Sequence, residues 1–436
     1  MCQRWRCVVF QSPRSLNLQL LCGPRTPAKD ILDIWPPLPL KIHAYGLLDS
    51  WDRTSSVDNI IAALGHDDRV CQIILGRLTN SPFRHITYSA AMQKPFPKLT
   101  HLLLGMLVYD RPGPTLPNSF LGGNAPRLQS LELANIPFPG LQKLLLSSTH
   151  LVHLDLYNIP RSGHIPPEAM ATSLSALTDL EFLRLRFQYP RPRPALEHRR
   201  PPPLTRPILP SLTTVIFKGA SEYLEEILSR IDAPRINKMH IAFFNQLIFD
   251  TPQLFQFITR VPTRRAPEKG RIIFNLEAVT VKFLSQTSDY GVLSARILCR
   301  APEWQLSSLE QLCASSLPPV STLEDLSIFS NGQYPPHWQV DIENTLWLDL
   351  LRPFVAVKNL YLSKEFVHHI VLALQELVGG RTTEVLPILE NIFLEGFRPA
   401  SLHQGIEKFV TARQLTGHLV NINVSPESDV CWEYTD

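Results

Sequence analysis

A short pattern of apolar residues recurs twelve times along this chain and constrains its fold more than any other feature. Each copy reads apolar, two variable residues, apolar, one variable residue, apolar. The copies begin at Val70, Leu99, Leu128, Leu151, Leu180, Leu212, Ile236, Leu276, Leu323, Val357, Leu389 and Leu419. Their spacing varies from 23 residues, between Leu128 and Leu151, to 47 residues, between Leu276 and Leu323. Recurrence at such intervals indicates a solenoid of stacked units rather than one closed core.

The second and third apolar residues of each copy lie two positions apart, so in an extended chain both side chains point to one face. Each copy therefore predicts a β-strand. Between copies the apolar spacing becomes helical, most clearly from Phe366 to Val378, with Ser363 before and Gly379 after as start and stop signals. Helices are also expected from Ser221 to Ile231 and from Pro252 to Val261.

One strand and one helix per unit predict an α/β leucine-rich-repeat solenoid, with irregular repeats, a parallel sheet on the concave face and helices on the convex face. The pattern places this solenoid at residues 70–425, after a connecting or capping segment at 12–69 and before a tail at 426–436. The long interval after Leu276 contains Val292 to Cys299, for which an extra strand is expected.

Residues 188–210 contain eight prolines and five arginines, which neither a helix nor an inner strand tolerates. An extended loop leaving the solenoid is expected there. A polyproline-reading domain could dock on it, and the alternative is a plain flexible insertion.

Composition narrows the class of partner and the compartment. The net charge of +3 is too small to recruit nucleic acid or an anionic membrane by itself. No apolar run approaches the roughly 18 residues of a membrane span, and the first residues lack the apolar core of a secretory signal. Seven cysteines without a Cys-x-x-Cys pair favour reduced thiols and a cytoplasmic or nuclear location.

The amino-terminal residues resemble the closing helix of an F-box. Cys2-Gln3-Arg4-Trp5-Arg6, followed by Val8-Val9-Phe10, is similar to the usual ending Val-Cys-x-x-Trp with small apolar residues after it. The continuation from Ser12 to Pro39, and blocks such as Leu121 to Leu131, resemble the F-box proteins with degenerate leucine-rich repeats that are expanded in mushroom-forming fungi. The resemblance extends over nearly the whole chain.

The resemblance implies a substrate receptor of a cullin ubiquitin ligase, which would bind a Skp-type adaptor through its F-box. Only residues 1–11 match the F-box, because its leading Leu-Pro, the acidic residue after it and its first two helices have no counterpart. Cys2, Trp5, Val8 and Phe10 are therefore expected to be a remnant of the adaptor-binding module. The alternative is a stand-alone leucine-rich-repeat scaffold that binds an acidic or phosphorylated partner without ligase function.

The variable positions beside the last two apolar residues of each copy are expected to line the concave face and to contact a protein partner. Cations occupy Arg184, Arg186, Lys218, Lys238 and Lys282, assigned to four successive strands, and His240 accompanies them. Strands about 4.8 Å apart would join these cations into one stripe suited to an acidic segment. Aromatic residues lie between them, at Tyr157, Phe182, Phe329, Tyr361 and Phe393. The alternative explanation is that the charges only solvate an exposed sheet.

No catalytic pattern is present. The sequence has no His-Glu-x-x-His, no Gly-x-Ser-x-Gly and no phosphate-cradling glycine loop. His153 with Asp155, and His368 with His369, lack a third convergent group. We therefore expect a binding protein rather than an enzyme, without a metal or cofactor.

Overall fold

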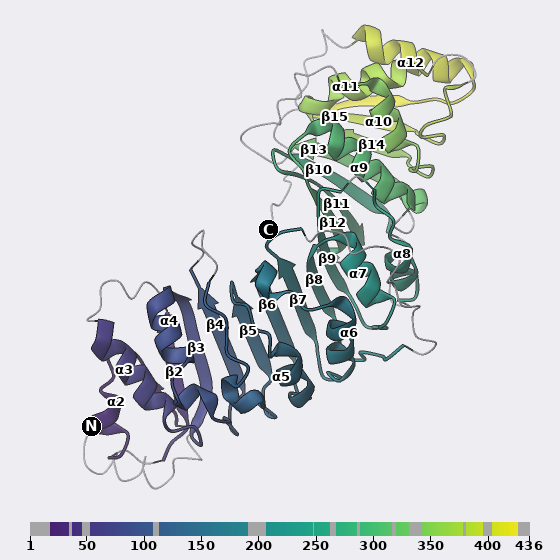
Figure 1. The fold of residues 1–436 in the computed structure, drawn as a ribbon. Helices are drawn as coiled ribbons and strands as arrows, with labels where there is room; N and C mark the ends of the chain where they lie inside the picture. Colours follow the sequence, from purple (N-terminus) through teal and green to yellow (C-terminus); the bar gives the residue numbers. More distant parts are fainter. Residues whose placement is uncertain are drawn as a thin grey trace. The chain divides into compact units, whose positions relative to one another are not determined.

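The computed structural model describes residues 18–34, 37–45, 53–107, 113–190, 206–246, 248–261, 267–285, 288–315, 320–330, 342–377, 381–395 and 403–425. Within these ranges, sixteen strands form one hydrogen-bonded sheet and are accompanied by eleven α-helices (Figure 1). The structure is therefore mixed α/β, as the sequence predicts. It divides into two compact units. Unit 1 is Met1–Ile216 with Arg230–Arg235, and unit 2 is Phe217–Ser229 with Ile236–Asp436.

Unit 1 alternates strands with short helices. Its strands are β1 (Leu20–Cys22), β2 (Leu40–Tyr45), β3 (Val70–Leu78), β4 (His101–Met106), β5 (Ser130–Ala134), β6 (His153–Ile159) and β7 (Phe182–Phe187). Its helices are α2 (Ala28–Ile31), α3 (Arg53–Leu64), α4 (Asn80–Thr87), α5 (Leu141–Ser147) and α6 (Pro167–Ser175), with 3₁₀ turns η2 (Ala91–Gln93), η3 (Phe120–Gly123) and η4 (Arg161–Gly163). Neighbouring strands from β1 to β7 pair in parallel. The sheet thus begins with two strands that precede the first copy of the repeat.

The repeated apolar residues form continuous rows across the strands of unit 1. Leu102 on β4, Leu131 on β5, Leu154 on β6 and Leu183 on β7 are aligned in register, and all four are buried. A second row two residues further along each strand is equally buried. Since no strand could bury these side chains alone, the rows explain why neighbouring repeats stack.

Unit 2 continues with longer helices, and β8 (Thr214–Gly219) contains the boundary between the units. Its strands are β9 (Lys238–Phe244), β10 (Lys269–Asn275), β11 (Ala278–Ser285), β12 (Ser288–Leu298), β13 (Asp325–Ser330), β14 (Asn359–Leu362), β15 (Asn391–Glu395) and β16 (Asn421–Ser425). Its helices are α7 (Ser221–Leu228), α8 (Pro252–Thr259), α9 (Pro302–Ser315), α10 (Asn344–Leu351), α11 (Lys364–Gln375) and α12 (His403–Leu415), with the 3₁₀ turn η6 (Val320–Thr322). The three helices expected from the sequence are α7, α8 and α11, and each is confirmed.

Three strands of unit 2 depart from the all-parallel expectation. The sheet order there is β9-β12-β11-β10-β13, and β11 pairs antiparallel with both β10 and β12. The copy beginning at Leu276 therefore forms the middle strand of an antiparallel meander, and Leu276 itself is 44% exposed in the turn before it. The extra strand expected from Val292 to Cys299 is confirmed as β12, which pairs in parallel with β9.

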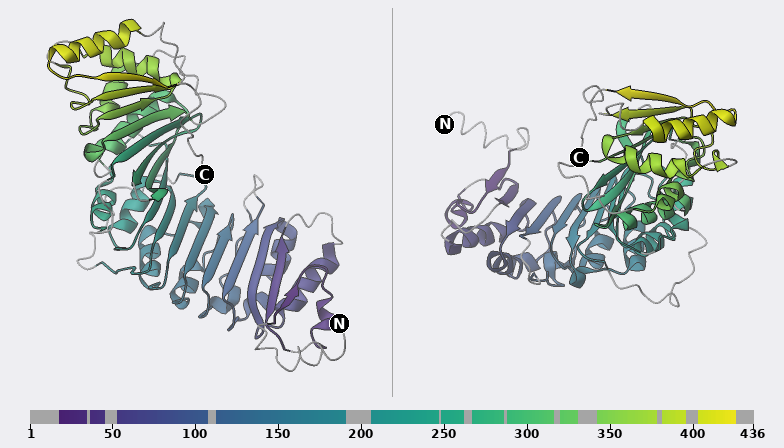
Figure 2. Two further views of the ribbon diagram at one scale, coloured as in Figure 1. Left: turned by 180° about the vertical axis from the view of Figure 1, so that it is seen from behind. Right: turned by 90° about the horizontal axis from the view of Figure 1, so that it is seen from above.

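The helices of unit 2 lie against one side of its strands (Figures 1 and 2). Aromatic side chains fill the space between the two layers, where the Trp347 ring of α10 lies 5.9 Å from Phe274 and 5.8 Å from Phe366. All three residues are fully buried. The core therefore occupies the helix side of the sheet, and the side chains on the opposite face of the strands are available for binding.

The segment between α11 and β15 is held by one buried arginine. Arg413 of α12 is fully buried and donates hydrogen bonds to the carbonyls of Thr382 at 2.9 Å and Leu386 at 3.1 Å. It also donates to the carbonyls of Pro387 and Leu389. These bonds satisfy backbone acceptors that the turn leaves without strand partners.

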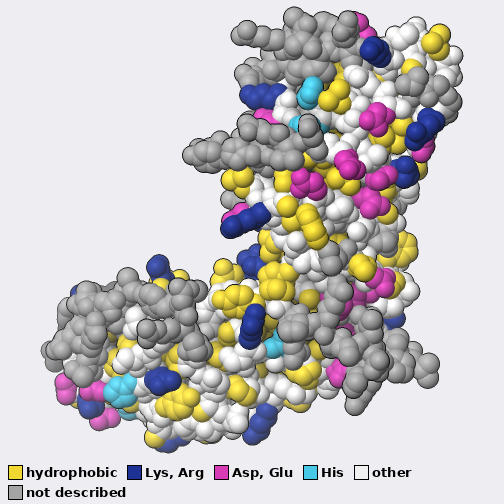
Figure 3. Space-filling model, turned by 45° about the horizontal axis from the view of Figure 1, so that its top comes forward, with side chains coloured by type: hydrophobic (Ala, Val, Ile, Leu, Met, Phe, Trp, Pro, Cys, Tyr) yellow, Lys and Arg dark blue, Asp and Glu magenta, His cyan; other side chains and the backbone are white. Residues whose placement is uncertain are grey.

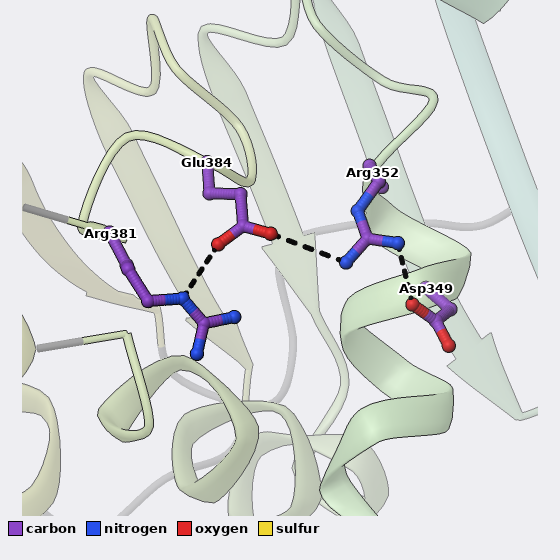
Figure 4. A network of polar contacts seen from close by, with 4 residues as sticks. All are labelled: Asp349, Arg352, Arg381 and Glu384. Atoms are coloured by element: carbon purple, nitrogen blue, oxygen red, sulfur yellow. Dashed lines mark hydrogen bonds and ion pairs between the residues drawn. The ribbon is translucent and has the colours of Figure 1, made fainter.

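Exposed charges hold the same segment from outside (Figure 4). Glu384 accepts from Arg381 Nε at 2.8 Å and from Arg352 Nη2 at 3.4 Å, and Arg352 also contacts Asp349 of α10 at 2.9 Å. The neighbouring arginines lower the pKa of Glu384 below its usual range, with the Arg381 hydrogen bond as the largest cause. Because all four side chains are well exposed, the network contributes little to stability.

The last strand is less covered than the others. On β15 the core-facing Ile392 and Leu394 are buried, whereas Ile422 and Val424 of β16 are 37% and 46% exposed. Among the described strands, β16 pairs only with β15. The repeat pattern predicts these strands correctly but not how completely each is buried.

Candidate protein-binding surface

Charged and aromatic side chains gather on the exposed strand face of unit 1. We define the β5–β7 cluster as Glu132, His153, Asp155, Tyr157, Phe182, Arg184 and Arg186. The parallel register places Asp155 between Glu132 and Arg184, and His153 beside Phe182. Three neighbouring strands thus bring together residues that are up to 54 positions apart in the sequence.

Asp155 and Arg184 form the centre of this cluster. Arg184 Nη1 lies 2.6 Å from Asp155 Oδ2, and the Asp155 residue is only 6% exposed. Burial raises the pKa of Asp155 above its usual range, and the nearby Arg184 only partly opposes that rise. Oδ1 of Asp155 and Nε of Arg184 have no hydrogen-bond partner among the described residues. Arg184 is therefore tied to its neighbour and is not a free cation for a partner.

Contacts with the Phe182 ring hold the neighbouring His153 and Arg184 side chains of the cluster in place. His153 stacks on Phe182 with ring centroids 4.3 Å apart, and the Arg184 guanidinium lies 5.2 Å from the same Phe182 ring. His153 Nε2 lies 4.0 Å from Glu132 Oε1. These stacked contacts fix the side chains before any partner binds.

Arg186 and Tyr157 are the members of the cluster best placed for contact. The Arg186 guanidinium lies 5.7 Å from the Tyr157 ring, which is 43% exposed. No described carboxylate forms an ion pair with Arg186. Tyr and Arg on a prearranged surface are the residue types that most often dominate binding energy in interfaces. On the face drawn in Figure 3, Lys and Arg side chains are interspersed with apolar ones.

Of the cations expected in unit 2, Lys218 and Lys238 lie on neighbouring strands, but Lys282 does not continue the succession. Lys218 on β8 lies over the Phe244 ring at 5.5 Å, and Lys238 and His240 are exposed on β9. Lys282 lies on β11, from which β9 is separated by β12. The expectation that Lys282 directly follows Lys238 is wrong, because β12, which comes after Lys282 in the sequence, pairs with β9 and lies between β9 and β11.

Two of the expected aromatic residues of unit 2 differ in accessibility. Tyr361 is half-buried and stacks on Phe393 of the next strand, with ring centroids 4.5 Å apart and an angle of 9°. Phe329 is only 8% exposed. The exposed strand face thus offers the Tyr361–Phe393 pair to a partner, but little of Phe329.

Asparagines form a ladder along the same face. Asn359 donates to Asp325 at 2.7 Å, Asn391 donates to Asn359 at 2.8 Å, and Asn421 donates to Asn391 at 3.2 Å. Lys269 Nζ lies 3.6 Å from Asp325 at the other end. The sequence analysis missed this ladder, although the three asparagines occupy the same position of the repeat and could have revealed it.

The sequence analysis also missed two arginines of unit 2. Arg271 on β10 and Arg296 on β12 share the strand face with Lys282. Neither strand carries the repeat, so no periodic signal marked them. The expected adaptor-binding residues Cys2, Trp5, Val8 and Phe10 lie outside the described residues, as does most of the 188–210 stretch.

The described part of the chain shows no constellation for metal chemistry. It contains no group of three or more His, Cys, Asp or Glu side chains arranged to hold a metal ion. Within those same residues, no helix has the length and apolarity that a bilayer crossing requires. Comparison with known families finds no family model that matches this sequence, and comparison with curated proteins finds no match. The geometry of the strand face must therefore carry the functional argument.

Proposed function

We propose that this protein is a protein–protein interaction module, a leucine-rich-repeat solenoid that binds a protein partner on its exposed strand face. The observation that carries the proposal is the Tyr157–Arg186 pair, an exposed ring and a cation held together on strands whose other face is fully packed. Rigid strands present such side chains with little loss of conformational entropy on binding.

The solenoid interpretation is supported by the stacking of the repeats. Among the described strands, nine of the twelve copies, on β3 to β7 and β13 to β16, pair in parallel with a neighbouring copy, and their apolar residues align in register. Repeats that cannot bury their own apolar face, but bury it against the next repeat, are the defining property of solenoid proteins. Such scaffolds carry out binding far more often than catalysis.

The test is quantitative affinity purification with wild-type protein and the double variant Tyr157→Ala/Arg186→Ala. We expect proteins that co-purify with the wild type to be depleted at least about tenfold by the variant, the effect of losing one interface hot spot. A matched control is Tyr189→Ala/Arg161→Ala, which removes another arginine–tyrosine contact, at 5.3 Å, outside the strands of unit 1. Equal depletion by both variants, or by neither, would contradict the proposal.

A second proposal follows from the resemblance to F-box proteins: the partner is a substrate and the module belongs to a cullin ubiquitin ligase. It is supported by the residues Cys2, Trp5, Val8 and Phe10 in the pattern of an F-box ending. Co-expression with a Skp-type adaptor tests it. A complex that forms with the wild type but not with Trp5→Ala supports the receptor role, whereas no complex with the wild type favours a stand-alone scaffold.

A further inference from the structure

The antiparallel meander of unit 2 concentrates positive charge on the exposed strand face. Arg271 on β10 and Lys282 on β11 are direct cross-strand partners, and Lys282 is in turn the partner of Ser294 on β12. Arg296 is two residues further along β12, opposite Thr280. Three cations thus lie on three neighbouring strands, with Cα atoms of opposed residues about 4.5 to 5.5 Å apart.

This arrangement is unfavourable without a counter-ion. Like charges directly opposite on a sheet destabilise it. Burial lowers the pKa of Arg271, which shows that its charge is partly removed from water. Neither Lys282 nor Arg296 forms an ion pair with any carboxylate among the described residues. Lys282 and Arg296 therefore place positive charge without a described carboxylate partner beside the half-buried Arg271.

Hydroxyl groups complete the site. Thr280, Ser294 and Ser327 occupy the same face at 8%, 7% and 8% exposure, in register with Arg296, Lys282 and Arg271 respectively. None of these three side chains hydrogen-bonds to another described residue. Paired cations with neighbouring hydroxyl donors are the groups that recognise a phosphate monoester.

The neighbouring residues limit what can bind. Ser327 is followed in register by the stacked Tyr361 and Phe393 rings, a surface suited to an apolar side chain. In the adjacent row, the Asp325 carboxylate would repel a polyanion that extended beyond the cations. The site therefore favours one compact dianion carried by a peptide over the continuous backbone of a nucleic acid.

We propose that Arg271, Lys282 and Arg296 bind a phosphorylated serine or threonine on an extended segment of a partner protein, with Tyr361 and Phe393 contacting a flanking apolar side chain. The proposal rests on the proposed function, because it supposes a protein partner on the strand face. It adds the chemistry of that partner and a location in unit 2.

Binding of peptide libraries tests it directly. The probes are short degenerate peptides with a fixed central phosphoserine or phosphothreonine, and the same libraries without phosphate. We expect the wild type to bind the phosphorylated libraries at least about tenfold more tightly. Lys282→Gln should remove most of that preference, because it halves the directly opposed pair of cations. No preference for phosphorylated peptides, or a preference unchanged in Lys282→Gln, would overturn the proposal, as would tighter binding of a single-stranded oligonucleotide.

A control variant and a stability measurement exclude general effects of charge or misfolding. Arg300→Gln removes a cation just after β12 whose side chain is 83% exposed and paired with Glu277 at 3.1 Å, so it should keep the preference. Millimolar inorganic phosphate should raise the melting temperature of the wild type, compared with chloride of equal ionic strength, but not that of Lys282→Gln. Equal stabilisation of both would count against the site.

The two proposals fail in different ways. Tyr157→Ala/Arg186→Ala should leave binding of the phosphorylated libraries unchanged, because those residues belong to unit 1. Loss of peptide binding in that variant would contradict the location of the phosphate site. Depletion of partners by that variant without any phosphate preference in the wild type would keep the proposed function and reject this inference.

Discussion

Strands β5 to β7 of unit 1 and β13 to β16 of unit 2 have the same parallel pairing but different side-chain chemistry on their exposed face. On β5 to β7, acids and a cation share one row, in which Asp155 lies between Glu132 and Arg184. On β13 to β16, amides repeat at one register position, and each bonds the next. Charges of one sign cannot repeat along neighbouring strands without repulsion, whereas an amide both donates and accepts and can repeat without limit.

The register of the strands alone therefore does not determine what a surface of repeats can bind. In unit 1, Arg184 forms an ion pair with Asp155, whereas Tyr157 and Arg186 remain available for contact with a partner. In unit 2 the side chains of the amide ladder are uncharged, and the neighbouring meander carries Lys282 and Arg296, which form no ion pair with a carboxylate among the described residues. Four measurements test this contrast.

The largest effect is expected in the interior of unit 2. Arg413→Met keeps the apolar stem but removes the donor to the buried carbonyl of Thr382 and one of the two donors to that of Leu386. We expect a loss of about 3 kcal/mol in the free energy of unfolding, measured with urea. Arg352→Met, which removes an exposed arginine from the network in Figure 4, is the control and should cost about 0.5 kcal/mol or less. Similar losses in both would show that Arg413 has no special role.

The next effect concerns the charged centre of unit 1. A double-mutant cycle with Asp155→Ala and Arg184→Ala should give a coupling energy of about 1 to 2 kcal/mol, because the pair is at 2.6 Å and partly shielded from water. The same cycle on Arg300 and Glu277, an exposed pair at 3.1 Å, should give about 0.5 kcal/mol or less. Equal coupling energies in the two cycles would mean that burial does not make the Asp155–Arg184 pair stronger than an exposed ion pair.

A smaller effect is expected from the amide ladder. Asn391→Ala removes the bonds to Asn359 and from Asn421, and it should cost about 1 kcal/mol. Asn344→Ala, which removes one exposed bond to Glu376, should stay within about 0.5 kcal/mol of the wild type. A ladder that acts only as a solvated surface would give the same small change in both variants.

The smallest effect is a pH dependence in unit 1. Because burial raises the pKa of Asp155 above its ordinary value of 3.8, the folded state binds that proton more tightly than the unfolded state. The stabilisation of the folded state by the protonated Asp155 carboxyl is therefore fully present below pH 3.8, and it is lost as the pH rises through the raised pKa. As the pH rises through that window, the free energy of unfolding of the wild type should fall relative to that of Asp155→Asn. A difference that stays constant would show that Asp155 titrates normally when folded.

Much of the fold is predictable because the repeat is a local signal. All twelve copies form strands, and α7, α8 and α11 lie where apolar spacing and helix boundary residues place them. The predictions that failed concern contacts between residues that are distant in the sequence. The Leu276 copy has the same spacing as the others, yet it joins an antiparallel meander because β10 and β12 flank it in the sheet.

The candidate site was predicted less completely than the fold. The sequence assigned Arg186, Lys282 and Tyr157 to the exposed strand face, and the structure places all three there. It could not show that Arg184 forms an ion pair with Asp155, since that pairing depends on the register of β6 against β7. It gave no indication of Arg271 or Arg296, because their strands lack the repeat.

Local sequence is sufficient to give this chain short strands alternating with helices, because the two-residue and helical spacings of apolar side chains act within a few residues. Which strands become neighbours depends instead on packing between distant parts of the chain. Charge pairing, the amide ladder and the cation site all depend on contacts between strands about 5 Å apart, and such contacts join residues that are distant in the sequence.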